Sequence, residues 1–269
     1  MIRETLRRSD IRPNKSYGQH FLSDKNILNK IADAATLSKE DIVLEVGTGI
    51  GTLTKPLASK AGFVVTVEVD QKLIPSAKDS LKEFNNIEIV NEDIMKCNIP
   101  EIMDRHPDLK HRKVVANVPY YITTPLISLF ISSKAKFETI VMTIQKEVAQ
   151  RIVSKPGNKR YGSLTVFVNY YTRPEIVFNI PASAFVPPPE VDSSVIRLEI
   201  LDKPSVIVKD EKLFFRVVRA AFNQRRKMLK NALEAAHINW PADTDIDGKR
   251  RGETLSIEEF AKLADLIAS

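Results

Sequence analysis

Short apolar runs alternate with amphipathic stretches over the first three quarters of the chain. The runs are rich in β-branched residues and too short for most helices, which is typical of buried strands. They cover residues 42–46, 63–70, 87–93, 114–121, 137–145, 163–172 and 193–201. Helical patterns follow the first two runs, over residues 52–61 and 74–84. This alternation predicts an α/β fold with a mostly parallel, mixed sheet and helices on both of its faces.

The strand pattern ends near residue 200, and residues 201–210 have the composition of a linker. Beyond them the chain has helical periodicity only. We therefore expect two domains, an α/β domain over residues 1–203 and a small all-α domain over residues 204–269.

A basic face is predicted in the all-α domain when residues 212–233 are drawn as one unbroken helix. One side of that helix is apolar, with Phe214, Val218, Ala221, Phe222, Leu229 and Leu233. The opposite side carries cations together with Asn223, and no acid lies between Glu211 and Glu234. Solvated faces usually mix both signs of charge, so we expect the phosphates of a polyanionic partner to contact this face. Its basic residues include Arg216, Arg219, Arg226, Lys227 and Lys230.

Composition limits the partners and the compartment. Forty Lys and Arg against 34 Asp and Glu give a net charge of +6, which permits a polyanionic partner. No apolar run approaches the roughly 20 residues that cross a membrane, and residues 1–15 lack the apolar segment of a secretory signal. One cysteine and four histidines offer no metal-ligand spacing. We expect a cytoplasmic protein without a metal.

The sequence E-V-G-T-G-I-G joins the first predicted strand to the first helix. Its glycines let a ligand approach bare backbone at a helix N-terminus: Gly47, Gly49 and Gly51. Glu45, just before the turn, would repel a pyrophosphate and attract a cation. Glu68 and Asp93 end the next two strands, where an acid can accept ribose hydroxyls. Together they predict a cationic adenosine ligand without phosphate, namely S-adenosylmethionine.

The sequence N-V-P-Y follows the fourth predicted strand. The side-chain oxygen of Asn117 and the backbone carbonyl of Val118 can accept the two N–H groups of an aromatic amine, which draws its nitrogen toward tetrahedral geometry. Tyr120 offers a face on which a flipped-out base can stack. By itself the motif also fits a proline turn with a buried Asn and Tyr. Next to a methyl-donor site, it indicates methylation of an amine.

Over nearly its full length the chain resembles the ribosomal RNA adenine N6,N6-dimethyltransferases of the kasugamycin-resistance type. The motifs that carry this resemblance occur in the family's order: K-S-Y-G-Q-H-F-L, E-V-G-T-G-I-G, V-E-V-D, N-E-D, N-V-P-Y-Y-I-T-T-P, F-V-P-P-P-E-V-D-S-S-V and A-F-N-Q-R-R-K-M-L-K-N-A-L. The resemblance implies a Rossmann-like methyltransferase fold. It also implies dimethylation of two adjacent adenosines near the 3′ end of 16S rRNA. The expected substrate is an immature 30S subunit, and the expected enzyme is a monomer.

The resemblance also assigns residues to the cofactor and to the base. The expected cofactor-binding residues are His20, Leu22, Gly47, Gly49, Glu68, Asp93 and Asn117. Among them, His20 and Leu22 would flank the methionine part. In catalysis, Asn117 would hold the substrate amine, and Tyr120 and Phe185 would sandwich the target base. The family commonly has Asn where His20 stands, so this contact departs from its pattern.

Two alternatives stay open at this point. A macrolide-resistance enzyme that methylates 23S rRNA would share the fold, although F-N-Q-R-R-K and P-P-P-E-V-D-S resemble the small-subunit branch better. A ribosome-assembly or transcription factor could keep the fold without methylating. The presence of Glu68, Asp93 and Asn117 argues against that loss of activity.

Overall fold

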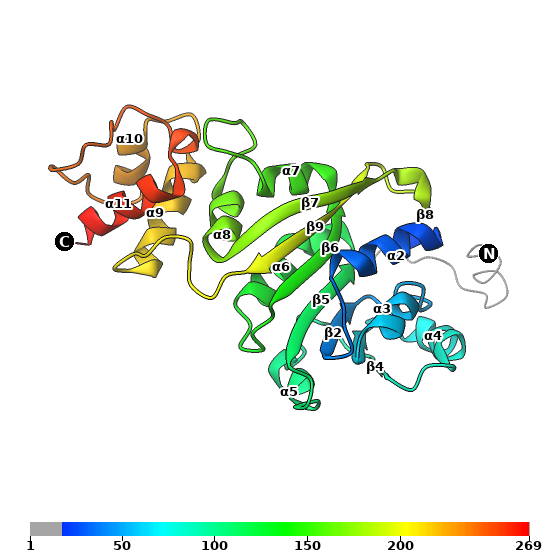
Figure 1. Ribbon diagram of the computed structural model, residues 1–269. Coiled ribbons are helices and arrows are strands. Elements are labelled where there is room, and N and C mark those ends of the chain that lie inside the picture. The colour runs from blue at the N-terminus through cyan, green and yellow to red at the C-terminus, as the bar shows by residue number, and fades with distance from the viewer. Residues whose placement is uncertain (1–17, 269) are drawn as a thin grey trace. The chain divides into compact units, whose positions relative to one another are not determined.

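The computed structural model describes residues 18–268, which divide into two compact units (Figure 1). The first unit holds the described residues up to Ala149 together with Glu175–Ile200, and the second holds Gln150–Pro174 and the chain from Leu201 onward. The start of the K-S-Y-G-Q-H-F-L motif, residues 15–17, lies outside the described residues.

A seven-stranded sheet organises the described part of the first unit, in the order β4-β3-β2-β5-β6-β9-β7 (Figure 1). The strands are β2 (Asp41–Val46), β3 (Phe63–Val67), β4 (Ile87–Val90), β5 (His111–Asn117), β6 (Thr139–Gln145), β7 (Thr172–Ile180) and β9 (Ser193–Ile200). Strands β4, β3, β2, β5 and β6 pair in parallel, and β9 runs antiparallel to β6. The predicted mostly parallel, mixed sheet is confirmed.

Helices flank the sheet because its central strands are buried on both faces. Every residue of β2 is buried, including those with opposite side-chain directions, so both faces need cover. The helices of this region are α2 (Lys25–Ala34), α3 (Thr54–Lys60), α4 (Ile74–Leu81), α5 (Ile99–Asp104), α6 (Thr123–Ile131) and α7 (Lys146–Ile152). Ile31 of α2 and Leu57 of α3 pack in one core with Val43, Val115 and Val141 of the sheet. The helices predicted over 52–61 and 74–84 correspond to α3 and α4.

The strand predicted over residues 163–172 is wrong, because this segment forms helix α8 (Ser163–Tyr171). Its β-branched and aromatic residues favour a strand locally. However, Val166 and Tyr170 lie four residues apart, on one helical face, and pack against Phe214 and Val218 in the core of the second unit. This tertiary packing decides the conformation. Because α8 packs in this core, residues 150–174 group with the C-terminal residues rather than with the sheet.

The second unit is helical beyond residue 200, with α9 (Glu211–Asn223), α10 (Leu229–Glu234) and α11 (Ile257–Ile267). The single helix drawn over residues 212–233 is therefore wrong, since it breaks between Asn223 and Leu229. Arg225 lies in the break, where its Nη2 donates to the carbonyls of Lys159 and Tyr161 and to Glu253. An unbroken helix would place this guanidinium on the apolar side, and the break lets it find polar partners. The apolar stripe itself holds, because its six residues pack in the core of this unit.

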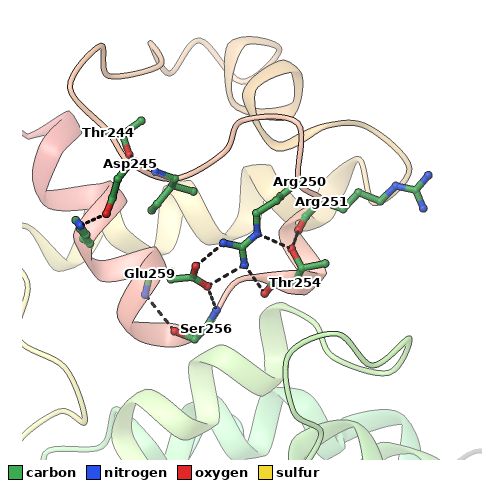
Figure 2. A network of polar contacts seen from close by, with 9 residues as sticks. Thr244, Asp245, Arg250, Arg251, Thr254, Ser256 and Glu259 are labelled. Carbon is green, nitrogen blue, oxygen red and sulfur yellow. Dashed lines mark hydrogen bonds and ion pairs between the residues drawn. The ribbon is translucent and has the colours of Figure 1, made fainter.

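Arg250 contacts the starts of both α10 and α11, and Figure 2 shows its side-chain contacts with Thr254 and Glu259. Its guanidinium donates to both carboxylate oxygens of Glu259 and to the carbonyl of Thr254 at 2.7 Å. Glu259 also accepts from the backbone N–H of Ser256, which caps α11. The carbonyl of Arg250 accepts from the first backbone N–H of α10, that of Leu229. Arg250 therefore contacts two helix N-termini, that of α10 through its backbone carbonyl and that of α11 through its side chain.

No helix within residues 18–268 combines the length and apolar character needed to span a membrane.

Replacing Arg250 with Ala should lower the free energy of unfolding of the second unit by about 1–2 kcal/mol, since it removes a charge-assisted pair that is partly exposed. The fluorescence of Trp240, the single tryptophan, reports this unit during urea unfolding because it packs against the unit's core. Arg251→Ala is the matched control, because the exposed Arg251 side chain points away from the network (Figure 2). Equal urea midpoints for the two variants would contradict the proposed role of the network.

Candidate functional site

A cavity of about 290 Å³ lies in the first unit, at the carboxyl ends of β2, β3 and β5. Its lining includes nine residues that the sequence analysis assigned to the cofactor or the target base: His20, Leu22, Gly47, Gly49, Glu68, Asp93, Asn117, Tyr120 and Phe185. Gly51, the third glycine of the turn, does not line it. Parallel strands bring their carboxyl ends to one sheet edge, which is why residues far apart in sequence meet there. The structure brings these nine residues together.

A short two-stranded sheet forms one wall of the cavity. β1 (Phe21–Leu22) pairs antiparallel with β8 (Phe185–Val186), and Leu22 lies opposite Phe185. Just before β1, Nδ1 of His20 lies 2.8 Å from the carbonyl oxygen of Pro187, just after β8. This pairing fixes both His20 and Phe185 beside the sheet.

The backbone conformation of the glycine turn disfavours side chains at Gly47 and Gly49. Gly47 and Gly49 have φ of +84° and +57°, a region that L-residues with side chains rarely adopt. A Cβ on Gly49 would lie 3.2 Å from the Phe21 ring, and one on Gly47 would lie 3.5 Å from the carbonyl oxygen of Asn117. The turn thus presents bare backbone to the cavity.

Glu68 is only 5% exposed and holds the glycine turn directly. Its Oε2 accepts from the N–H of Gly49 at 2.8 Å, and its Oε1 accepts from the N–H of Asp70 at 2.9 Å. Burial raises the pKa of this carboxyl, against the lowering effect of the two backbone donors. Each oxygen keeps a second lone pair, so the ionised group can still accept two ribose hydroxyls.

Asp93 follows β4 and is half-buried at the cavity wall. Its Oδ1 accepts from the backbone N–H of Met95 at 3.0 Å, which fixes the carboxylate at the start of the next turn. A carboxylate held in this way can accept from an exocyclic amine of a bound adenine.

Asn117 and Tyr120 are both oriented by side-chain contacts. Nδ2 of Asn117, the last residue of β5, donates to the carbonyl oxygen of His20 at 3.5 Å. The hydroxyl of Tyr120 lies 2.7 Å from Oγ of Ser193. Burial raises the pKa of Tyr120, so its ring is a neutral phenol at physiological pH. With Nδ2 directed at His20, the remaining polar atom of the Asn117 amide is an acceptor.

Glu45 does not line the cavity, which corrects the expectation that it would attract the cation. It is fully buried beneath the glycine turn, where Thr54 of α3 donates to its Oε2 at 2.7 Å. Burial raises its pKa to about 8, while Thr66 and Thr54 act in the opposite direction. The side chain is therefore neutral at pH 7, and it links β2 to the start of α3.

The charge of the cavity wall has one sign. The described residues that line it include three acids, Glu68, Glu92 and Asp93, and no Lys or Arg. Such a wall suits a cation and disfavours a phosphate. Within residues 18–268, no cluster of His, Cys, Asp and Glu has the arrangement of a metal site.

The cavity also includes residues that the sequence analysis did not assign to it. Thr48 lies within the glycine turn, and Glu92 stands next to Asp93. Tyr121 lines the cavity with 64% of its surface exposed. Their positions inside the recognised motifs could have indicated them.

The predicted RNA-binding cations lie in the second unit and are all exposed: Arg216, Arg219, Arg226, Lys227 and Lys230. Two of them have partners within the unit. Arg216 donates to the carbonyls of Ala236 and His237 at 3.2 and 3.1 Å, and Lys230 lies 3.9 Å from Glu234. Arg226 and Lys227 lie in the segment between α9 and α10, so these cations do not share the face of one continuous helix.

A family model described as ribosomal RNA adenine dimethylase matches residues 11–269. The chain belongs to this family. It is 46% identical to ribosomal RNA small subunit methyltransferase A of Clostridium botulinum (strain Okra / Type B1) over 271 residues, which cover 98% of each chain. It is 48% identical to the protein of the same name from Caldanaerobacter subterraneus subsp. tengcongensis over 263 residues, which cover 96% of this chain and 98% of that one.

Two solved structures show how far the fold of this adenine dimethylase is shared. A dimethyladenosine transferase from Plasmodium falciparum superposes with a TM-score of 0.76 and 28% identity, covering 91% of this chain and 96% of the other. The 23S rRNA methyltransferase ErmE superposes with a TM-score of 0.73 and 25% identity, covering 93% and 100%. The predictions of the family, of the Rossmann-like methyltransferase fold and of an enzyme that uses S-adenosylmethionine are confirmed.

In this adenine dimethylase, Glu45→Gln should change how stability depends on pH. The pKa of Glu45 is about 8 in the folded chain and about 4.5 in the unfolded chain, so only the folded chain binds the proton between these values. Wild-type stability should therefore fall as pH rises from about 4.5 to about 8, by roughly 3–5 kcal/mol from this group. Gln cannot ionise, and its advantage over wild type should grow across that window.

Urea unfolding at pH 5, 6, 7, 8 and 9, followed by circular dichroism, measures this difference. Glu83→Gln, at an exposed position after α4, is the control and should differ from wild type by the same amount at every pH. A Glu45→Gln difference that stays constant from pH 5 to pH 9 would mean that Glu45 is ionised in the folded chain.

Proposed function

We propose that this enzyme dimethylates the N6 amines of two adjacent adenosines near the 3′ end of 16S rRNA, within an immature 30S subunit. The carrying observation is that Asn117 and Tyr120 line the same cavity as Glu68 and the glycine turn. An amine acceptor and an aromatic face thus meet a site for a cationic adenosine cofactor. The names of the curated relatives support the small-subunit substrate.

The cofactor proposed for this cavity is S-adenosylmethionine, which when bound supplies a methyl group carried on a sulfonium. The lining fits this group, since its carboxylates and bare glycine backbone would accept a cation and its apolar residues include Leu22. Glu68 would accept the ribose hydroxyls, and Asp93 would accept from the adenine amine. The other proposed contacts with the cofactor are made by His20, Leu22, Gly47 and Gly49.

The substrate amine would be oriented by acceptors rather than activated by a strong base. The side-chain oxygen of Asn117 and the carbonyl of Val118 would each accept one N–H of the target N6 amine. Two fixed acceptors favour the pyramidal nitrogen of the transition state over the planar nitrogen of free adenine. Tyr120, held by Ser193, would restrain the base. Most of the rate enhancement would come from this alignment.

Methylation of 23S rRNA is the second candidate, because the chain superposes on ErmE nearly as well as on the dimethyladenosine transferase. Primer extension on both large and small ribosomal RNAs, from cells with and without this protein, separates the two.

A factor that retains the fold without activity is tested by tritium transfer from the cofactor to immature 30S particles. Mass spectrometry of small-subunit nucleosides gives the most direct test, since loss of dimethyladenosine without the protein supports the proposal.

We place the proposed RNA contacts on the exposed cations of the second unit. Arg219, Arg226 and Lys227 have no side-chain hydrogen bond or ion pair among the described residues, unlike Arg216 and Lys230. They are therefore the strongest candidates for phosphate contacts. We further propose that the enzyme is a monomer and that it acts on ribosomal particles in the cytoplasm.

Glu68→Ala and Asn117→Ala should affect different steps. Loss of two charge-assisted hydrogen bonds to ribose should weaken cofactor binding by about 2–4 kcal/mol in Glu68→Ala. Asn117→Ala should bind cofactor nearly as wild type but transfer methyl groups roughly 100-fold more slowly, because its acceptor acts mainly in the transition state. Calorimetry with cofactor and tritium transfer to immature 30S particles measure the two effects.

Glu83→Ala, which removes an exposed carboxylate outside the cavity, should change neither quantity. Wild-type cofactor affinity in Glu68→Ala would remove that residue from the site. A wild-type transfer rate in Asn117→Ala would assign N-V-P-Y a structural role.

The double variant Arg219→Ala with Arg226→Ala should weaken binding to immature 30S particles and flatten its dependence on salt. Each lost phosphate contact should reduce the log–log slope by about 0.7 to 0.9. Cofactor affinity should not change, because the cavity residues belong to the first unit. Filter binding at several salt concentrations measures the slope.

Lys55→Ala with Lys78→Ala removes the same charge from exposed positions of α3 and α4, and it is the matched control. Equal slopes for the two double variants would indicate that RNA docks elsewhere, such as on the segment containing Arg7, Arg8, Arg12 and Lys15, which lies outside the described residues.

A further inference from the structure

Tyr121 places an exposed aromatic ring at the edge of the cavity, directly after Tyr120 of its wall. It lines the cavity and yet keeps 64% of its surface exposed. Every other Phe, Tyr and Trp of residues 18–268 is buried or half-buried. An aromatic face that is open to water beside a cavity is a surface on which a ligand can stack.

The two tyrosines point in different directions because they share a tight turn. They belong to the 3₁₀ turn η3 (Tyr120–Ile122), in which successive side chains point about 120° apart. The hydroxyl of Tyr120 pairs with Ser193, whereas the Tyr121 side chain has no hydrogen bond or ring contact among the described residues. Part of the Tyr121 ring borders Gly18, since a Cβ there would lie 3.5 Å from its Cε1. The rest of the ring is open to a ligand.

The strand order β4-β3-β2-β5 places Tyr121 on the amine side of the cavity. Glu68 and Asp93 follow β3 and β4, while Tyr121 follows β5, which lies on the other side of β2. Neighbouring strands are about 4.8 Å apart, so β5 lies roughly 14 Å from β4. We therefore expect a ligand on Tyr121 to lie near Asn117 and the substrate, away from the adenine of the cofactor.

The chemistry of the cavity edge favours a base as that ligand. The lining carries three acids and no Lys or Arg among its described residues, so it disfavours a phosphate, and Tyr121 adds aromatic surface. An adenosine that enters the cavity loses its stacking on the next nucleotide, which costs free energy. A ring outside the cavity that stacks on the nucleotide left behind would offset part of this cost.

We propose that Tyr121 stacks on the base of the nucleotide adjacent to the target adenosine, an inference that rests on the proposed function. The target base lies in the cavity beside Tyr120, and its neighbour stays outside against Tyr121. Tyr121 is then a substrate-binding residue that selects for a second base next to the target. In a pair of adjacent target adenosines, each base can serve as the neighbour of the other.

Two small ligands separate the stack on Tyr121 from the site of the target base. Adenosine can fill the cavity alone, and the dinucleotide adenylyl-3′,5′-adenosine adds the neighbouring base. The Kd of each is measured by calorimetry with saturating S-adenosylhomocysteine, for wild type, Tyr121→Phe, Tyr121→Leu and Tyr121→Ala. Val177→Ala is the control, because it shortens an exposed apolar side chain of β7 that does not line the cavity.

We expect wild type and Val177→Ala to bind the dinucleotide about 5- to 150-fold more tightly than adenosine, the gain from one base stack. Tyr121→Phe should keep this ratio within about threefold, since it keeps the aromatic face. Tyr121→Leu and Tyr121→Ala should bring the ratio close to one, with the Kd of adenosine and of S-adenosylhomocysteine unchanged.

Three results would overturn the stack on Tyr121. The first is a ratio that is equal in wild type and Tyr121→Ala. The second is an equal loss in Tyr121→Phe and Tyr121→Ala, which would assign the effect to the hydroxyl. The third is a weaker affinity of Tyr121→Ala for adenosine or S-adenosylhomocysteine with an unchanged ratio, which would make Tyr121 a structural residue of the cavity.

Methyl transfer to immature 30S particles, measured on the same wild-type protein, distinguishes failure of this inference from failure of the proposed function. No transfer together with the expected dinucleotide preference would reject only the proposed function. Transfer without any preference for the dinucleotide would reject only the stack on Tyr121. Binding of neither ligand by wild type would overturn the stack as well, since it would show that the cavity holds no adenosine.

Discussion

The cavity depends above all on the buried carboxylate of Glu68. Its two oxygens accept the backbone N–H groups of Gly49 and Asp70, so one side chain joins the loop after β2 to the loop after β3. Glycine at position 49 is needed for this contact, because its φ of +57° turns the N–H toward the carboxylate and leaves no side chain against Phe21. Burial opposes ionisation, and the two donors offset part of that cost. The same group that shapes the turn thus keeps free lone pairs that can accept from the proposed ligand.

Beneath this contact, the sheet supplies a rigid support. β2 is buried along its whole length and carries Glu45, whose neutral carboxyl accepts from Thr54 at the start of α3. Thr48 and Thr66 pair at 2.6 Å beside it, one in the turn and one in β3. These buried polar contacts join three successive elements below the glycine turn. A loop that must keep positive φ values at several residues is held in that conformation by such support.

Much of the fold and most of the cavity could be predicted because their signals are local. Except for β7, the strands of the sheet coincide with short apolar runs, and Gly47, Glu68, Asp93 and Asn117 lie at or near the carboxyl ends of four of them. Three other features could not be read in this way. The helical state of residues 163–171 depends on packing against Phe214, and the break after Asn223 depends on distant partners of Arg225. The parallel rings of His20 and Tyr120 require the pairing of β1 with β8, which no local pattern encodes.

The distribution of charge in the two units favours entry of a base over entry of a phosphate. The cavity is lined by Glu68, Glu92 and Asp93 with no Lys or Arg among its described residues, so an RNA phosphate brought into it would be repelled. A neutral base meets no such barrier, and the ring of Tyr120 in the cavity wall offers it contact area without charge. The exposed cations of the second unit are not part of this acidic lining, because they belong to a separate unit. The acidic lining therefore favours a neutral base over a phosphate, whereas the exposed cations of the second unit would favour phosphates.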